Sequence, residues 1–378
     1  MSSELVAGVN ARAARWRRLP FARAIALYLI GRFVTLIGVA LANLFTHHGL
    51  TNDLSIWDGA WFLQAVHVGY PTHLPMHDGR VLANPIAFFP LFPLLIRGFA
   101  YVSGLSAAGI GIALSLLSGL SAVIAVGFLT AEFAGRVKAE RAAMLFAVSP
   151  GAFVFNLIYA EGLVITMVAL GLWALVRRRW LLAGVLGALA TATSPVGLTF
   201  VVSCVVVASL AIVRERAWRS LVAPLLAPLG FVAWMGYLWI HTGSATAWRR
   251  TELGGWKSYP SLRYPLHVLA NFLSNPLSPT MTGQILFAGT VVSVAGLILA
   301  YREHQPTAVL AYVTSAVLLF LISAPVGLRP RFVMLAFPLA IAVATRFDGW
   351  RFRLAMSVSS VLMLLMTIET LTSYAVFP

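Results

Sequence analysis

Residues 51–97 read TNDLSIWDGAWFLQAVHVGYPTHLPMHDGRVLANPIAFFPLFPLLIR and form the longest break in an otherwise hydrophobic chain. Aspartates, histidines and aromatic residues occur together here, whereas the flanking segments are almost wholly apolar. We therefore expect a loop between membrane-spanning segments that carries the chemistry of the protein, with Asp58 at its centre. That expectation depends on where the rest of the chain places the loop.

The composition excludes a soluble globular protein. Of the 378 residues, 60% are hydrophobic and 10% charged, and the mean hydropathy is +0.88, whereas about a quarter of the residues of a soluble domain are charged. The net charge of +15 comes from short basic clusters between apolar runs, which is the positive-inside pattern and not a nucleic-acid-binding face. The single cysteine, Cys204, excludes a disulfide framework or a cysteine metal site within one chain.

The N-terminal region predicts a first membrane span. Five arginines precede an apolar run at about 24–45: Arg12, Arg15, Arg17, Arg18 and Arg23. The run is longer than the roughly 7–15 apolar residues of a signal peptide. We interpret residues 1–23 as a basic cytoplasmic N-terminus and the run as a transmembrane helix.

Further apolar runs predict an all-α polytopic membrane protein with a single integral membrane domain over residues 1–378. The expected spans lie at about 106–131, 141–158, 159–176, 181–195, 197–213, 220–240, 282–300, 306–323, 331–345 and 354–376. If every basic cluster between them faces the cytoplasm, the crossings alternate without conflict. The prediction is about eleven helices, with the N-terminus inside and the C-terminus outside.

The number of membrane crossings decides the role of residues 87–104, AFFPLFPLLIRGFAYVSG. Counting this run as a span would place the cluster Arg136, Lys138 and Arg141 outside, so we expect a juxtamembrane helix in the outer interface. Two long outer loops follow from this topology, at 46–105 and 241–281. The second is rich in tryptophan and tyrosine and carries basic residues on the side that normally lacks them.

Carboxylate chemistry on the outer face must use one of six acids: Asp53, Asp58, Asp78, Glu161, Glu252 and Glu369. Asp58 lies between Trp57 and Trp61, which can exclude water and raise the pKa of the carboxyl toward that of a general base. The alternative is a solvated loop aspartate that caps a short helix. Asp53 is expected to be a structural cap.

Glu161 follows Tyr159 at the turn between two expected spans. An ionisable group at that depth indicates a functional role or a paired partner. The alternative is a carboxylate held at the interface by snorkelling or by Tyr159.

Cations on the outer face are suited to a lipid-linked phosphate, because a guanidinium can bind two phosphate oxygens at once. The candidates are Arg329 and Arg331 at an outer helix end, and Arg249 and Arg250 in the second loop. Arg331 is the strongest candidate, since desolvation at a helix end strengthens the contact. Lys257 and Arg263 fit ordinary anionic headgroups.

A metal site is not expected. His73, His77 and Asp78 are the nearest to a ligand set, but Pro75 lies between the two histidines and prevents a shared helix face. Their spacing matches no strong ligand signature.

Four short motifs resemble, in order, the PIG-V/Gpi18-like mannosyltransferases of the GT-C superfamily. They are WDGAWF at 57–62 with GY at 69–70, AFFPLFPLL at 87–95, YAEG at 159–162, and PRF at 330–332 ahead of FP at 337–338. The likeness extends from about residue 20 to residue 345, and the loop from 242 to 256 is similar to bacterial, chiefly actinobacterial, members. Glu161 is followed by Gly162 where the family usually has serine, and the segment 192–197 lacks an arginine that commonly precedes its proline.

The resemblance implies the GT-C fold, with juxtamembrane helices in a long first outer loop and a catalytic aspartate that maps onto Asp58. It implies transfer of mannose with inversion from polyprenyl-phosphate-mannose to a glycolipid, lipoglycan or protein acceptor. The reaction would occur on the non-cytoplasmic face of the plasma membrane, without a nucleotide donor. A metal cofactor is not expected, because a lipid monophosphate beside an arginine is already a competent leaving group. Trp57, Trp61, Tyr159, Glu161 and Trp256 are then the expected substrate-binding residues.

Two other classes remain as alternatives. A lipid or glycan transporter or flippase also has many helices with polar groups, but its ionisable residues should lie near the bilayer midplane, often in paired halves. Here they gather on the outer face without a detectable repeat. The second alternative is a family member that has lost activity and serves as a membrane assembly partner, against which the intact Asp58 argues.

Overall fold

A computed structural model describes residues 20–46, 49–276 and 281–372 of the chain, so the predicted cytoplasmic N-terminus lies almost wholly outside the described residues. The first elements are α2 (Ala22–Thr46), α3 (Leu50–Leu54), α4 (Asp58–His67), β1 (Met76–His77), β2 (Arg80–Val81), η1 (Pro85–Ala87), α5 (Leu91–Ser103), α6 (Ala107–Ala134), α7 (Arg136–Ala147), η2 (Pro150–Asn156), α8 (Glu161–Val176), α9 (Trp180–Thr193) and α10 (Gly197–Glu215). They are followed by η3 (Trp218–Leu221), α11 (Val222–Leu226), α12 (Leu229–Thr242), α13 (Ala247–Gly254), β3 (Tyr259–Pro260), α14 (Tyr264–Ser274), α15 (Thr282–Arg302), α16 (Thr307–Ile322), β4 (Ser323–Ala324), α17 (Pro330–Leu335), α18 (Pro338–Arg346) and α19 (Gly349–Thr372). The η elements are single stretches of 3₁₀-helix.

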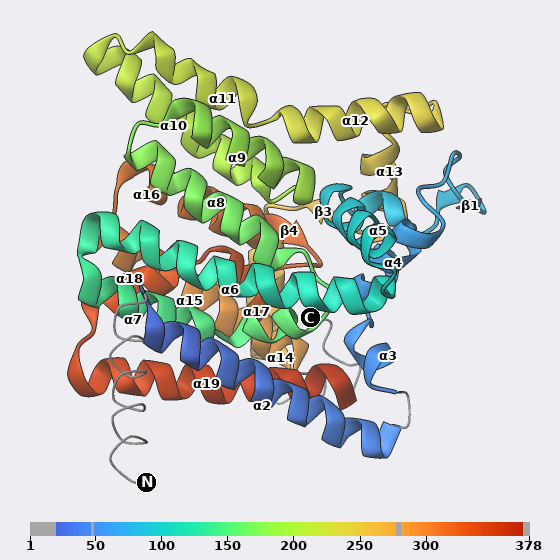
Figure 1. The fold of residues 1–378 in the computed structure, drawn as a ribbon, viewed down its shortest axis with the longest axis horizontal. Helices are drawn as coiled ribbons and strands as arrows, with labels where there is room; N and C mark the ends of the chain where they lie inside the picture. Colours follow the sequence, from blue (N-terminus) through green and yellow to red (C-terminus); the bar gives the residue numbers. More distant parts are fainter. Residues whose placement is uncertain (1–19, 47–48, 277–280, 373–378) are drawn as a thin grey trace, which may run out of the picture.

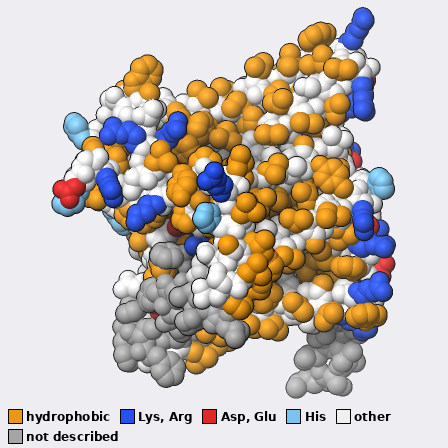
Figure 2. All heavy atoms as spheres, turned by 180° about the vertical axis from the view of Figure 1, so that it is seen from behind, with side chains coloured by type: hydrophobic (Ala, Val, Ile, Leu, Met, Phe, Trp, Pro, Cys, Tyr) orange, Lys and Arg blue, Asp and Glu red, His pale blue; other side chains and the backbone are white. Residues whose placement is uncertain are grey.

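The long helices lie side by side, and the short elements of the outer loops gather at one end of them (Figure 1). Within the described residues, six helices are long and apolar enough to cross a membrane, or seven if a bent pair is counted as one span. Hydrophobic side chains cover most of the face seen in Figure 2, and basic side chains gather toward its two ends. This distribution is that of an integral membrane protein.

The predicted span at 141–158 is wrong. α7 ends at Ala147, and η2 runs from Pro150 to Asn156 before the chain turns by 116° into α8. Pro150 lacks the N–H that would continue the α-helical hydrogen bonds from α7, so a new element begins there. The break could not be predicted from hydropathy, because residues on both sides of it are apolar and hydropathy carries no information on the direction of the backbone.

The predicted span at 331–345 is also interrupted, because it is divided into α17 and α18 before Pro338. The run at 220–240 contains Pro228 between α11 and α12, but Trp218–Thr242 is still one of the six stretches long and apolar enough to cross a membrane. Several of the remaining apolar helices are shorter than 18 residues. The count of about eleven spans therefore stays a prediction.

Within the predicted juxtamembrane segment 87–104 the structure has one short helix, α5. α5 has 13 residues, which corresponds to about 20 Å at 1.5 Å per residue, against a hydrocarbon core of about 30 Å. It buries Phe92, Pro93 and Ile96 on one side and exposes Tyr101 and Val102. A helix of this length is too short to cross the hydrocarbon core, and its position in the outer interface stays a prediction.

A buried arginine fixes η2 against the N-terminal span. Arg32 of α2 is 3% exposed. Its guanidinium donates to the carbonyl of Ala152 and, over 3.0 Å, to Oδ1 of Asn156. Nδ2 of Asn156 donates in return to the carbonyl of Arg32 over 3.1 Å. These bonds satisfy polar groups that would otherwise be costly in a membrane core, and they hold the segment that leads to Tyr159 and Glu161.

The second outer loop docks on the first. Thr251 of α13 accepts a hydrogen bond of 3.2 Å from Nδ2 of Asn84, whose Oδ1 accepts from the backbone N–H of Ile86. Gly254 and Gly255 permit a close approach, since an added Cβ would lie 2.9 Å from the carbonyl oxygen of Val81 and 2.7 Å from Cα of Ala83, respectively. The two loops thus form one structure at the end of the helices.

Candidate active site

Asp58 is the first residue of α4 and lies close to the break between η2 and α8. The following glycine allows this approach, because an added Cβ at Gly59 would lie 3.3 Å from Cβ of Ile158. The backbone N–H of Ile158 donates to the carbonyl of Leu54 over 3.1 Å, which fixes the start of the loop to the same segment. A carboxylate in the first turn of α4 is also favoured by the helix dipole.

Arg331 joins the two predicted carboxylates. Its Nη1 lies 2.5 Å from Oδ2 of Asp58 and 3.5 Å from Oε1 of Glu161. The side chains of Arg331, Asp58 and Glu161 are 14%, 24% and 12% exposed, so the cluster is largely removed from solvent but still accessible. We refer to these three residues as the central cluster. Its one guanidinium and two carboxylates leave a net negative charge when all are ionised.

The backbone of α17 reaches this position only because residue 151 is a glycine. An added Cβ at Gly151 would lie 2.4 Å from the carbonyl oxygen of Pro330 and 2.7 Å from Cα of Arg331. Real Cβ atoms do not tolerate such distances to backbone atoms, so the contact between η2 and α17 requires glycine. The dipeptide Pro150-Gly151 therefore both interrupts the span and brings Arg331 to Asp58.

Tyr159 forms the buried side of the central cluster. It is 1% exposed, and its ring lies 5.3 Å from Cζ of Arg331. The backbone N–H of Asp58 donates to its hydroxyl over 3.4 Å. Ser115 of α6 clamps the tyrosine backbone, accepting from its N–H at 3.0 Å and donating to its carbonyl at 3.1 Å.

Glu161 is fixed by the residue that follows it. Gly162 packs on α6, where an added Cβ would lie 2.5 Å from the backbone nitrogen of Gly119 and 2.6 Å from Oγ of Ser118. The departure from the serine usual in the resembled family thus has a structural reason in this chain. A side chain at residue 162 would push Glu161 away from Arg331.

Aromatic residues from both outer loops form one wall beside Asp58. Trp61 lies 5.2 Å from Trp256 and 6.3 Å from Phe88, and Phe88 lies 5.4 Å from Trp256, between ring centroids. All three are partly exposed. We call Trp61, Phe88 and Trp256 the aromatic wall. Trp57, by contrast, packs against the main hydrophobic core.

The other predicted cations lie outside the central cluster of Arg331, Asp58 and Glu161. Arg249 and Arg250 are exposed on α13, and Nη2 of Arg250 lies 3.5 Å from Sδ of Met76. Arg329 is near enough to Arg331 and Tyr264 for electrostatic interaction with both. Their assignment to a phosphate stays a prediction, whereas Arg331 is brought directly to the central cluster.

His77 and Asp78 of the first outer loop lie on an exposed hairpin. β1 and β2 pair antiparallel, with Met76 opposite Val81 and His77 opposite Arg80, and Asp78-Gly79 makes the turn with positive φ at both residues. Nε2 of His77 lies 3.4 Å from Oδ2 of Asp78, and the two side chains are 75% and 88% exposed. Within residues 20–46, 49–276 and 281–372, no three His, Cys, Asp or Glu side chains are grouped to hold a metal ion. The expectation of no metal stays untested.

Glu252 is a site residue that the sequence did not single out. It is the only acid in residues 241–281. Burial of its carboxyl raises the pKa to about 7, the Ser258 hydroxyl that hydrogen-bonds the carboxylate opposes the rise, and the nearby charge of Asp58 adds to it. An isolated acid in an otherwise basic outer loop was the available signal.

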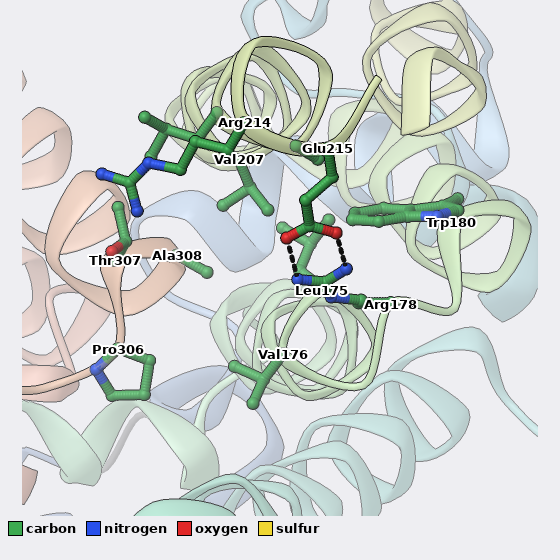
Figure 3. Close-up of a pocket in the computed structure, with 12 residues that line it drawn as sticks. Leu175, Val176, Arg178, Trp180, Val207, Arg214, Glu215, Pro306, Thr307 and Ala308 are labelled. Carbon is green, nitrogen blue, oxygen red and sulfur yellow. Dashed lines mark hydrogen bonds and ion pairs between the residues drawn. The ribbon is translucent and has the colours of Figure 1, made fainter. Parts of the chain in front are cut away.

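A cavity of about 250 Å³ lies at the other end of α8 and contains none of the predicted site residues. It is lined by the end of α8 and by α10 and α16, beside the ion pair of Arg178 with Glu215 (Figure 3). Arg214 and Thr307 lie together on its opposite wall. The central cluster is therefore distinct from this cavity.

Neither a protein-family model nor a curated protein sequence matches this chain. Solved structures do match it. ArnT from Cupriavidus metallidurans, bound to undecaprenyl phosphate, aligns with a TM-score of 0.53 and 15% identity over 88% of this chain. The oligosaccharyltransferase of Archaeoglobus fulgidus, in complex with Zn and sulfate, aligns with a TM-score of 0.52 and 15% identity over 90% of this chain.

The chain has the GT-C fold. It spans 61% of the ArnT chain and 53% of the oligosaccharyltransferase chain. At this level of identity the likeness concerns the fold alone. The predicted fold class is thus confirmed, and the activity must be argued from the site.

Proposed function

We propose that this protein is an inverting membrane glycosyltransferase that moves mannose from polyprenyl-phosphate-mannose to a glycolipid, lipoglycan or protein acceptor. The observation that carries the proposal is the central cluster, in which Arg331 meets Asp58 and Glu161 where the outer loops converge. The fold adds support, because one neighbour is named as an oligosaccharyltransferase and another was solved with undecaprenyl phosphate. The choice of mannose rests on the motif resemblance.

Asp58 is assigned as the general base. Its carboxylate accepts the proton of an acceptor hydroxyl while that oxygen bonds to the anomeric carbon of the donor. The bond from this carbon to the phosphate oxygen breaks, and its electron pair leaves with the polyprenyl phosphate. The configuration inverts because the acceptor attacks from the face opposite the phosphate.

Arg331 is assigned two tasks in this scheme. Before the donor binds, it orients Asp58 through the ion pair, and Glu161 contacts the same guanidinium nitrogen. Its buried Nε has no hydrogen-bond partner among the described residues, which leaves a donor for a phosphate oxygen. A guanidinium that contacts the phosphate stabilises the negative charge that develops on the leaving group.

We also propose that this chemistry takes place on the non-cytoplasmic face of the plasma membrane. The proposal follows from the positive-inside pattern, which puts both long outer loops on the side away from the basic clusters. A reporter fused after Gly104 tests it. A reporter enzyme that is active only outside the cytoplasm should be active when fused at this position. Activity of a cytoplasmic reporter fused there contradicts the topology.

The transporter alternative fits the arrangement less well. A transporter site is expected near the middle of the spans, whereas Asp58 and Arg331 lie at helix starts in α4 and α17, beside the outer-loop elements. The central cluster also provides a base beside a cation for a leaving phosphate, which transport does not require.

In vitro transfer tests the proposal. The full chain, purified and placed in nanodiscs, is incubated with radiolabelled polyprenyl-phosphate-mannose and a lipid extract. Label should move to a new lipid, and polyprenyl-phosphate-glucose should compete poorly. The glycolipid profile of a deletion strain then identifies the acceptor, since its mannosylated product disappears and the precursor accumulates. Donor that remains intact under all conditions contradicts the proposal.

A further inference from the structure

Positive charge is in surplus at the end of α8 opposite Glu161, where the cavity of Figure 3 lies. The carboxylates described at this end of the fold already have partners. The partners are Arg177 for Glu132, Arg178 for Glu215, Arg346 for Glu303, Arg141 for Asp348, and the backbone N–H groups of Arg23 and Ala24 for Glu140. A further arginine at this end therefore finds no unengaged carboxylate among the described residues.

Arg214 is such an arginine, and it lines the cavity. It lies exposed in the last turn of α10, and its guanidinium makes no hydrogen bond or ion pair with any residue that the structure describes. The neighbouring Glu215 does not neutralise it, because both carboxylate oxygens of Glu215 are bonded to Arg178 across the cavity (Figure 3). That ion pair is neutral as a whole, so the cavity keeps the positive charge of Arg214.

The rest of the lining is amphipathic. Thr307, the first residue of α16, lies beside Arg214 on the same wall and adds a hydroxyl (Figure 3). Leu175, Val207 and Leu210 contribute apolar surface. Trp180 lies next to the ion pair on the opposite wall, and tryptophan is enriched at the depth of the lipid headgroups. A cation and a hydroxyl beside apolar side chains match a phosphate that is esterified to a glycerol.

The size of the cavity limits how much of a ligand it can enclose. Its volume is about 250 Å³, whereas sites that enclose a drug-sized molecule have roughly 300–1,000 Å³. A phosphate with its glycerol can enter, and the acyl chains of a lipid must stay outside against the apolar surface of the helices. Such surface is at hand, since Val213 beside Arg214 is 81% exposed.

We propose that this cavity binds the phosphate of an anionic phospholipid in the membrane leaflet opposite the central cluster. Arg214 donates to the phosphate oxygens, and the Thr307 hydroxyl donates a further hydrogen bond. The positive-inside pattern predicts that this end faces the cytoplasm, where basic pockets between helices attract anionic headgroups. A headgroup without a net charge is favoured less, because it leaves the surplus charge of Arg214 in place. The inference does not depend on the reaction proposed at Asp58.

Lipid titrations of the full chain test the inference. The protein is purified in a neutral detergent and titrated with dioleoylphosphatidylglycerol, and native mass spectrometry gives the Kd of the first bound lipid. The variants are Arg214→Gln, which removes the charge, and Leu210→Trp, which fills the cavity and keeps the charge. The matched control is Arg136→Gln, because Arg136 is exposed at the same end, near the pair of Glu132 with Arg177, and does not line the cavity. Thermal unfolding confirms that each variant is folded.

We expect the Kd for phosphatidylglycerol to rise by about tenfold or more in Arg214→Gln and Leu210→Trp, and to stay within about twofold of the wild type in Arg136→Gln. Phosphatidylcholine, whose headgroup carries its own cation, should bind the wild type more weakly than phosphatidylglycerol. An unchanged Kd in Arg214→Gln, an equal rise in Arg136→Gln, or equal binding of the two lipids by the wild type overturns the inference. Displacement of the lipid by an excess of inorganic phosphate shows that a free phosphate is the ligand, and it overturns the assignment to a lipid.

Discussion

Nη1 of Arg331 lies 2.5 Å from Oδ2 of Asp58, although 273 residues separate the two in sequence. The pair connects the first outer loop with the start of α17. Glu161 contacts the same guanidinium nitrogen. A buried or half-buried ion pair of this kind contributes little net stability, since desolvation offsets much of the attraction. Its value in this protein is the orientation of Asp58.

Arg331→Lys tests that orientation. Lysine keeps the charge but lacks the planar fork that can hold Asp58 and Glu161 or a phosphate in a defined geometry. We expect kcat to fall by about 10-fold or more in Arg331→Lys and by about 100-fold or more in Arg331→Ala. Arg346→Lys at the other end of the fold, where Nε lies 4.0 Å from Oε1 of Glu303, is the control and should retain the wild-type rate. Full activity of Arg331→Ala contradicts the assignment.

Gly151→Ala tests the contact between η2 and α17. The new Cβ would meet the carbonyl oxygen of Pro330 and Cα of Arg331, so α17 must shift. We expect a loss of about 1–3 kcal/mol in stability, together with a strong loss of transfer. Gly98→Ala in α5 is the matched control, because nothing lies within 4 Å of the added Cβ. The unfolding temperature and the transfer rate of each variant are measured. If Gly151→Ala and Gly98→Ala give the same values, the close contact between η2 and α17 is not required.

The pKa of Glu252 predicts a pH dependence of stability. Burial raises this pKa from its ordinary value of 4.5 to about 7, so between these values the folded protein holds a proton that the unfolded chain has lost. The contribution of Glu252 is present below pH 4.5 and is lost as the pH rises to about 7. The unfolding temperature of the wild type should therefore fall relative to that of Glu252→Gln between about pH 5 and pH 7, then run parallel. Curves that are parallel throughout contradict the raised pKa.

Much of the site was recognisable from residue types alone. Asp58 was selected as an acid between two tryptophans and through the motif resemblance, Glu161 as an ionisable group at the end of a span, and Arg331 as a cation suited to a phosphate at an outer helix end. Tyr159 was expected to bind substrate. Their contact was not predictable, because it depends on the turn at Pro150 and on the glycine that admits the backbone of α17. Neither feature alters hydropathy, which is the signal from which the spans were predicted.

The structure also separates residues that looked equivalent in sequence. Arg249 and Arg331 both appeared as outer cations, but only Arg331 comes to Asp58, since Arg249 is on the exposed side of α13. Glu252, three residues further along the same helix, is only partly exposed and was not singled out. Which face of a short loop helix is buried depends on the docking of the two loops, and an eight-residue helix carries too little periodicity to reveal it.

The most direct test of the account is transfer from polyprenyl-phosphate-mannose by Asp58→Asn. The asparagine keeps the size of the side chain and removes its ability to accept a proton, so kcat should fall by at least about 100-fold. Donor binding should be retained, as measured by the donor KM or by equilibrium binding. Near-normal turnover of Asp58→Asn would contradict the assignment of Asp58 as the base and, with it, the mechanism.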